Sequence, residues 1–290
     1  MKFLLFSLLV LLCLPLPQTA GPQQKKVAEP VRPPQIIRTT SRHEARRFGY
    51  SGTVTIVGAP SGSITVEGWS RNEVDISAEI ELRANSETDL ALLAAVNNFV
   101  VDDDANHLQV LTTGTHDKAF MKTAKKFPKA LLGLPWKIDY RIRVPSITDL
   151  EVNAGRGPIT ISGVEGNVRV AAAESVANLK MSGGVLSATV GAGKVSLEVP
   201  ARSWARGSVE VRVAAGDINV AIPAGFSGDF DAEVLRAGKI VNTYEGLEPR
   251  EKLASANKMS LRAGAGGASF ALTVGDGTIV IRKQTADSKQ

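Results

Sequence analysis

A short glycine-rich segment is the first place where residue types and spacing suggest chemistry. It reads GAGKVS at 191–196, and glycines beside a lysine can cradle a phosphate group. A phosphate loop would also need glycine where Ala188 stands, and serine or threonine where Val195 stands. We therefore interpret these glycines as turn residues and predict no phosphate or cofactor site.

An acidic segment has part of the pattern of a calcium-binding loop. Asp102, Asp104 and Asn106 have its alternate spacing, but His107 replaces the required glycine and Thr113 the bidentate glutamate. A hairpin turn between two strands fits this pattern better. The chain has three histidines, none in paired spacing: His43, His107 and His116. The sequence therefore predicts no metal site.

Catalysis by a carbohydrate-active enzyme would need carboxylates gathered on one face. The outward positions of the strand pattern described below are mixed in charge and type, and no serine lies in a Gly-x-Ser-x-Gly elbow. The sequence thus predicts a protein that is not an enzyme. The alternative is a polysaccharide lyase or hydrolase, which would need several of these side chains in one cleft: Glu151, Glu165, Glu210 and Asp217.

Two stretches could bind a ligand without catalysis. Trp204 lies between strand patterns and is flanked by Arg202 and Arg206, so its ring is predicted to be exposed and able to stack on a sugar. The second stretch is the segment 116–137, which we call the basic insertion. Across 117–143 there are eight Lys and Arg against two Asp, interleaved with aromatic residues. Its candidate contacts with an anionic glycan or lipid are Lys122, Lys125, Lys126 and Lys129. The alternative is a lid whose lysines only face water.

The elements that must position these residues follow from a repeat. Apolar-x-apolar triplets recur, mostly at intervals of nine residues, with glycines between them. Their first residues are Leu150, Ile159, Val168, Leu186, Val195, Val209 and Ile218. Outer residues of each triplet should point into a core and the middle residue to water, as Ile161 and Thr160 illustrate. The pattern predicts an all-β fold, a stack of short strands like a β-solenoid or β-helix, rather than a sandwich.

The rest of the 290-residue chain is predicted to flank this stack. Residues 1–21 resemble a signal peptide with cleavage near Ala20 or Gly21, and 22–47 form a Pro-rich basic linker. The domain spans 48–283, with a helix near 86–98 that begins at Ser86 and with the partly helical basic insertion, and 284–290 form a polar tail. The single cysteine, Cys13, lies in the leader, and no later stretch is predicted to cross a membrane.

Three stretches carry a family resemblance: GSITVEGWSRNEVDISAEIEL at 62–82, YRIRVPSITDLEVNAGRGPITISGVEGNVRV at 140–170 and GDGTIVIRK at 275–283. With them the chain resembles the bacterial "putative adhesin" family, which implies an exported β-rich solenoid with no catalytic residues. We expect an exported, non-enzymatic envelope or surface module that binds anionic glycan, lipid or surface proteins, and no nucleic acid. An envelope-stress or signalling accessory is another possibility.

Overall fold

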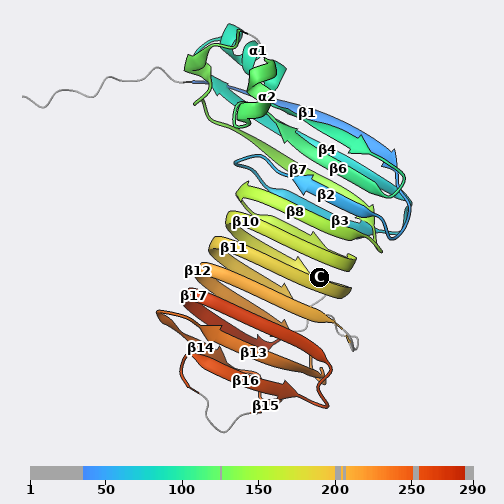
Figure 1. Cartoon of the computed structure of the whole chain (residues 1–290), viewed down its shortest axis with the longest axis vertical. Coiled ribbons are helices and arrows are strands. Elements are labelled where there is room, and N and C mark those ends of the chain that lie inside the picture. Colours follow the sequence, from blue (N-terminus) through green and yellow to red (C-terminus); the bar gives the residue numbers. More distant parts are fainter. Residues whose placement is uncertain (1–34, 125, 200–203, 205–206, 251–254, 285–290) are drawn as a thin grey trace, which may run out of the picture. The chain divides into compact units, whose positions relative to one another are not determined.

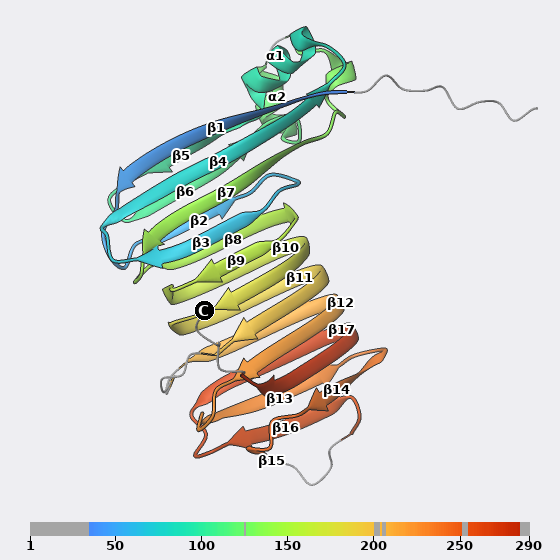
Figure 2. The same ribbon diagram turned by 180° about the vertical axis from the view of Figure 1, so that it is seen from behind.

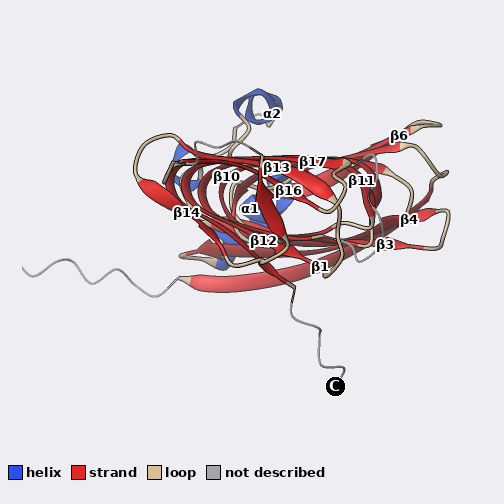
Figure 3. Ribbon diagram, turned by 90° about the horizontal axis from the view of Figure 1, so that it is seen from below, coloured by secondary structure: helices blue, strands red, loops and turns tan. Residues whose placement is uncertain are grey.

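One turn of the stacked strands, which we call a coil, takes 18 residues, so each nine-residue repeat of the sequence forms half of a coil. Val168 pairs in parallel with Leu186, 18 positions along the chain, whereas Ala177, nine positions along, pairs with Val195. Alternate repeats therefore stack, and consecutive repeats lie in two facing layers (Figure 3). The predicted stack of short strands is therefore not built from consecutive repeats, because the chain turns a corner after each one.

The computed structural model describes residues 35–124, 126–199, 204, 207–250 and 255–284. Four long strands bend through both layers: β10 (Glu165–Lys180), β11 (Gly183–Glu198), β12 (Ser208–Ile222) and β17 (Ala268–Lys283). They join the layers into one sheet of 17 strands (Figure 1). The all-β prediction is confirmed, although these strands have 15 or 16 residues and are not short.

Shorter strands extend each layer beyond the long ones. Layer 1 runs in the order β5 (Asn98–Asp103), β6 (His107–Thr113), β2 (Thr53–Val57), β8 (Asp149–Arg156), the first halves of the long strands, β13 (Gly228–Val234), β16 (Lys258–Ala263) and β15 (Leu247–Pro249). Layer 2 runs in the order β1 (Ile36–Arg47), β4 (Glu73–Ala84), β7 (Trp136–Pro145), β3 (Ile64–Trp69), β9 (Ile159–Ser162), the second halves of the long strands and β14 (Gly238–Asn242) (Figure 2).

The core between the layers consists of side chains in register from strand to strand. In layer 1 one buried row is Leu108, Val54, Leu150, Val168, Leu186, Val209, Phe270, Phe230 and Leu261. In layer 2 the facing row is Tyr140, Ile64, Ile159, Ala177, Val195, Ile218, Ile279 and Ile240. Because each strand alone buries few side chains, stability comes from contact between neighbouring coils.

Two helices lie at one end of the stack (Figure 1). In α1 (Glu87–Val96) the hydroxyl of Ser86 accepts a hydrogen bond from the Asp89 amide at 3.1 Å, and Leu90 and Leu93 are buried. The predicted helix near 86–98 and its cap are therefore confirmed. The basic insertion contains α2 (Lys118–Thr123) and a 3-10 turn (Lys129–Leu131), so it is partly helical as predicted, but its last two residues already belong to β7.

The predicted linker over 22–47 is wrong for its second part. Residues 36–47 form β1, which pairs with β4 along its whole length. Arg42 points from β1 toward layer 1, donates to the carbonyl of Phe99 at 2.6 Å, and lies 4.3 Å above the ring centroid of Phe99. An edge strand with inward charged side chains covers the core without offering a surface for further strand pairing. Residues 22–34 and the predicted signal segment lie outside the described residues, as does the tail from 285 onward.

A buried carboxylate holds three strands of layer 2 together. Asp75 on β4 is 5% exposed, accepts a hydrogen bond from Arg143 Nε of β7 at 3.0 Å, and is hydrogen bonded to His43 Nε2 of β1. Burial raises the pKa of Asp75, but the hydrogen bonds from His43 and Arg143 outweigh it and hold the pKa below its ordinary value of 3.8.

Replacing Asp75 with asparagine is expected to lower the free energy of unfolding by about 1–2 kcal/mol at pH 7. Because the folded-state pKa of Asp75 is depressed, its contribution is complete above 3.8 and disappears as the pH falls through the lower folded value. Urea unfolding at a series of pH values should therefore show the wild type and Asp75→Asn converging in acid. A stability difference that is constant from pH 7 into acid would contradict this role.

Candidate functional site

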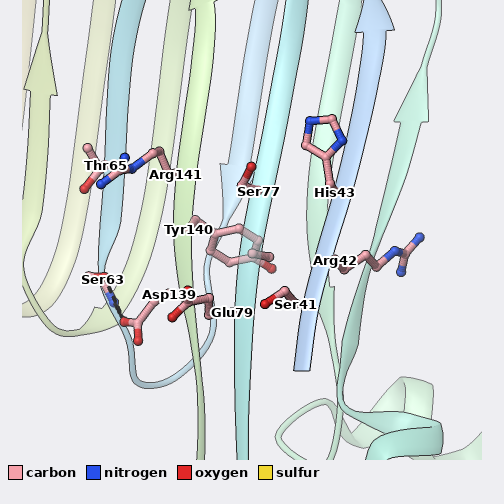
Figure 4. A pocket seen from close by; sticks show the side chains of 11 residues that line it. Ser41, Arg42, His43, Ser63, Thr65, Ser77, Glu79, Asp139, Tyr140 and Arg141 are labelled. Carbon is pink, nitrogen blue, oxygen red and sulfur yellow. Dashed lines mark hydrogen bonds between the residues drawn. The ribbon is translucent and has the colours of Figure 1, made fainter. Parts of the chain in front are cut away.

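The outer face of layer 2 carries a polar furrow near the β1 end of the stack. It has a volume of about 540 Å³ and crosses β1, β4, β7 and β3 (Figure 4). The residues that line it are Ser41, Arg42, His43, Ser63, Thr65, Ser77, Ala78, Glu79, Asp139, Tyr140 and Arg141. The phenol of Tyr140 points into the core, where it is hydrogen bonded to Thr112 at 2.7 Å.

Strand register arranges the outward side chains in two rows. His43, Ser77, Arg141 and Thr65 are successive partners across the four strands and form one wall. Ser41, Glu79 and Asp139 are successive partners in the other wall, and Ser63 continues it. On each strand the two rows are two positions apart, as Ser41 and His43 are on β1, so both rows face outward and the furrow lies between them.

Several of these side chains already have partners. Arg42 is hydrogen bonded toward layer 1, and His43 is bound to Asp75. Asp139 accepts from the amide and hydroxyl of Ser63 at 2.7 and 2.8 Å and from Lys137 Nζ at 2.8 Å. Burial raises the pKa of Asp139, but these hydrogen bonds outweigh it and keep the pKa below its ordinary value.

Arg141 and Glu79 are left without a partner. Neither side chain forms a hydrogen bond or ion pair with any residue in the described part of the chain. Glu79 stands directly opposite Asp139 on an antiparallel strand, an arrangement of like charges that is unfavourable. Figure 4 shows the two carboxylates side by side and Arg141 extending toward Thr65. A ligand that donates to Glu79 and accepts from Arg141 would therefore find both groups available.

Ser77, His43 and Asp75 are the residue types of a hydrolase triad and lie close together, but they do not have its hydrogen bonds. A catalytic triad needs a histidine bonded to both its carboxylate and its nucleophile. His43 is bonded to Asp75, but among the described residues it forms no hydrogen bond with Ser77. The hydrogen bonds of the described residues therefore do not form a triad in the furrow. No local sequence pattern marks the furrow, because its residues come from four segments that only strand register brings together.

Trp204 is not an exposed sugar-stacking residue, and that prediction is wrong. Its side chain is 6% exposed, donates from Nε1 to the carbonyl of Gly184 at 2.8 Å, and meets the ring of Phe270 edge-on at 5.9 Å between centroids. The large apolar ring fills space between the layers, which stabilises the stack more than exposure would. Arg202 and Arg206 lie outside the described residues.

The basic insertion presents lysines to solvent. Lys122, Lys126 and Lys129 are exposed, and so is Lys118, which the sequence analysis did not single out. Within the described residues none of these four forms an ion pair, and Lys125 lies outside them. The segment is anchored by Phe127 and Trp136, which pack against the core, while α2 buries no residue.

The four carboxylates of the enzyme alternative do not all lie together, although Glu151 and Glu210 line one pocket of about 390 Å³. Glu151 and Glu210 are both on the outer face of layer 1 but three strand spacings apart, about 14 Å between backbones. Glu210 is paired with Arg212. Asp217 belongs to a corner of the coil, where it accepts from the Thr278 amide at 2.9 Å. A retaining or inverting pair needs carboxyl groups within about 10 Å, and the backbones of Glu151 and Glu210 are further apart than that. Glu165, at the start of β10, lines a different pocket.

The other sequence patterns have structural roles. GAGKVS lies inside β11, so no loop leads into a helix there. Asp104 accepts from the amides of Asn106 and His107, both at 2.9 Å, and closes the predicted hairpin between β5 and β6. In the ranges that the structure describes there is no group of three side chains suited to a metal ion. The helices described are also too short and too polar to cross a membrane.

No protein-family model matches this chain, and no curated protein matches it. Among solved structures, it is similar to a "putative cell adhesion protein" from Clostridium sporogenes, with 15% identity, 84% of this chain and 100% of that chain covered, and a TM-score of 0.44. A "putative adhesin" from Bacteroides fragilis is 11% identical, with 83% and 97% covered and a TM-score of 0.26. A "putative lipid binding protein" from Parabacteroides distasonis is 9% identical, with 84% and 97% covered and a TM-score of 0.20. At these values the three chains establish neither a family nor a function for this one.

Proposed function

We propose that this chain is an exported, non-enzymatic binding module of the bacterial cell envelope, a β-solenoid whose basic insertion docks on an anionic lipid surface. The observation that carries the proposal is the set of exposed lysines without acidic partners in the described residues: Lys118, Lys122, Lys126 and Lys129. Each lysine held near an anionic membrane contributes about 1 kcal/mol of binding free energy.

Apolar side chains among these lysines favour lipid over glycan. Leu132 is 40% exposed, and Phe120 and Met121 are only half-buried on a helix that buries nothing. All three gain free energy by entering the boundary between head groups and acyl chains, whereas on a polysaccharide the aliphatic Leu132 and Met121 have no ring with which to stack on a sugar. The basic residue and apolar run at the start of the sequence support export, which brings the chain to an envelope.

A function as an enzyme is less well supported, because Glu151 and Glu210, which line one pocket, are three strand spacings apart and Glu210 is paired with Arg212. An envelope-stress or signalling accessory could use the same docking surface, so docking does not distinguish it from a structural or adhesive module. The proposal therefore concerns the physical act of binding at the envelope.

Reversing the charge of the insertion tests the proposal. Lys122→Glu/Lys126→Glu/Lys129→Glu is expected to weaken binding to phosphatidylglycerol-containing vesicles roughly 100-fold or more in a sedimentation assay, since three favourable charges are lost. Wild-type binding should fall with added salt and be absent on phosphatidylcholine vesicles.

The matched control changes three exposed lysines elsewhere, Lys194→Glu/Lys239→Glu/Lys258→Glu, and has the same net charge. We expect it to keep most of the vesicle binding. Equal loss in both variants would show attraction by net charge alone, and unchanged binding in the first would refute the docking surface. Binding to a soluble anionic polysaccharide, but not to vesicles, would replace lipid by glycan.

A further inference from the structure

The wall of the furrow that contains Arg141 continues far along layer 2. From Ser77, strand pairing leads through Arg141 to Thr65 and then along β9, β10, β11 and β12. We call the uncharged members of this line the polar row: Ser77, Thr65, Thr160, Asn178, Ser196 and Asn219. No side-chain hydrogen bond joins any of them to another residue in the part of the chain that the structure describes.

The corresponding line on the outer face of layer 1 is different. There Thr55, Glu151, Arg169, Ser187 and Glu210 follow one another, so the line contains charges of both signs as well as neutral groups. Outward positions on this scaffold thus do not have to be neutral. The polar row offers one short donor and acceptor per strand, at the strand spacing of about 4.8 Å.

This spacing and chemistry fit a linear sugar polymer. A pyranose unit in an extended chain is about as long as the distance between neighbouring strands, and its hydroxyls both donate and accept. Serine and threonine hydroxyls and asparagine amides do the same, so they can follow a chain that lies across the strands. The furrow then provides a hollow at one end of the row, where a sugar unit would be enclosed.

The charges in the furrow favour a neutral ligand. The two charged groups of the furrow without partners among the described residues are Arg141 and Glu79, which have opposite signs. A phosphate, sulfate or uronate bound by Arg141 would meet Glu79 and Asp139 in the facing wall. A neutral sugar instead lets Arg141 donate to one hydroxyl while another hydroxyl donates to Glu79, which relieves the like-charge contact with Asp139.

We infer that the furrow and the polar row together form a binding track for a linear neutral polysaccharide, with Arg141 and Glu79 fixing one sugar unit in the furrow. The track is on layer 2 and is independent of the basic insertion. The same chain could then hold a lipid surface and a glycan at once. No catalytic step is involved.

The test is titration with cellohexaose and chitohexaose, both neutral, and with an oligogalacturonate of the same length, followed by calorimetry and by amide chemical shifts. We expect one of the neutral hexaoses to bind and to shift the amides of Thr160, Asn178 and Ser196 more than those of Ser187 and Thr189 on layer 1. Arg141→Ala and Glu79→Gln should each weaken binding roughly tenfold, because each removes a hydrogen bond to a charged group.

Arg169→Ala is the matched control, since Arg169 is also exposed and outward but lies on layer 1. It should leave the affinity unchanged, as should the triple lysine variant of the basic insertion. No binding of either neutral hexaose up to its solubility would overturn the inference. Equal effects of Arg141→Ala and Arg169→Ala, or a preference for the oligogalacturonate, would overturn it as well. Vesicle binding is measured separately, so failure here leaves the lipid proposal standing.

Discussion

Gly216→Ala is expected to destabilise the protein by about 3–5 kcal/mol. Gly216 lies at a corner of the coil with φ +138°, and a Cβ there would stand 1.7 Å from the carbonyl oxygen of Gly193 in the preceding coil. Gly193 has φ +124° and makes the same close approach to Ser175, at 2.0 Å. A methyl group therefore adds backbone strain and also forces two coils apart, which weakens their parallel hydrogen bonds.

The measurement is the urea midpoint and slope at neutral pH. Gly133→Ala is the control, because a Cβ at Gly133 meets no atom within 4 Å and its backbone is not left-handed. That change should be neutral or slightly stabilising through the unfolded state. If Gly216→Ala lowered the unfolding free energy no more than Gly133→Ala, the claim that successive corners are in close contact would be refuted.

This corner also explains which part of the fold the sequence could predict. Alternation within each triplet sets the inward and outward faces, since strand side chains alternate whatever lies above or below. Ile159 and Ile161 are buried and Thr160 is not, as predicted. The interval of nine, however, is the same whether repeats stack directly or alternate between two layers. Only the pairing of Val168 with Leu186 distinguishes them.

Strand β1 escaped prediction for a related reason. Its residues alternate between two polar faces, so no apolar periodicity marks it as a strand. Its inward Arg42 is satisfied by hydrogen bonds to Asn98 and Phe99 of β5, which are more than fifty positions away in the sequence. A prediction from the local sequence pattern cannot include partners that are so distant in the sequence. The basic composition of 36–47 indicated a linker, but those charges cover the open end of the core.

The same limit applies to the candidate sites. The basic insertion could be found because its lysines are close together in sequence and its charge balance is local. The furrow could not, because Arg141 and Glu79 are ordinary outward residues of two strands and become notable only beside Asp139. A tryptophan between strand patterns and arginines suggests a surface loop, but the ring of Trp204 contacts Gly184 and Phe270 in the interior.

Ile161→Asp is expected to abolish cooperative folding. Ile161 is 0% exposed and pairs with Val66 of β3 on one side and Leu179 of β10 on the other, in the middle of layer 2. A carboxylate there has no buried cation to pair with among these neighbours, and burying it costs more than about 5 kcal/mol, comparable to the whole stability of a typical domain. Circular dichroism and a thermal scan should show no native transition near that of the wild type.

Thr160→Asp introduces the same carboxylate one position earlier, and this makes it the sharpest comparison. Thr160 points outward between Thr65 and Asn178, so the new charge remains hydrated and should change the unfolding free energy by no more than about 1 kcal/mol. A register shift of one residue would exchange the two outcomes, because it turns every side chain of β9 to the opposite face. Equal tolerance of aspartate at both positions would mean that β9 has no buried face, and the two-layer core could not then exist.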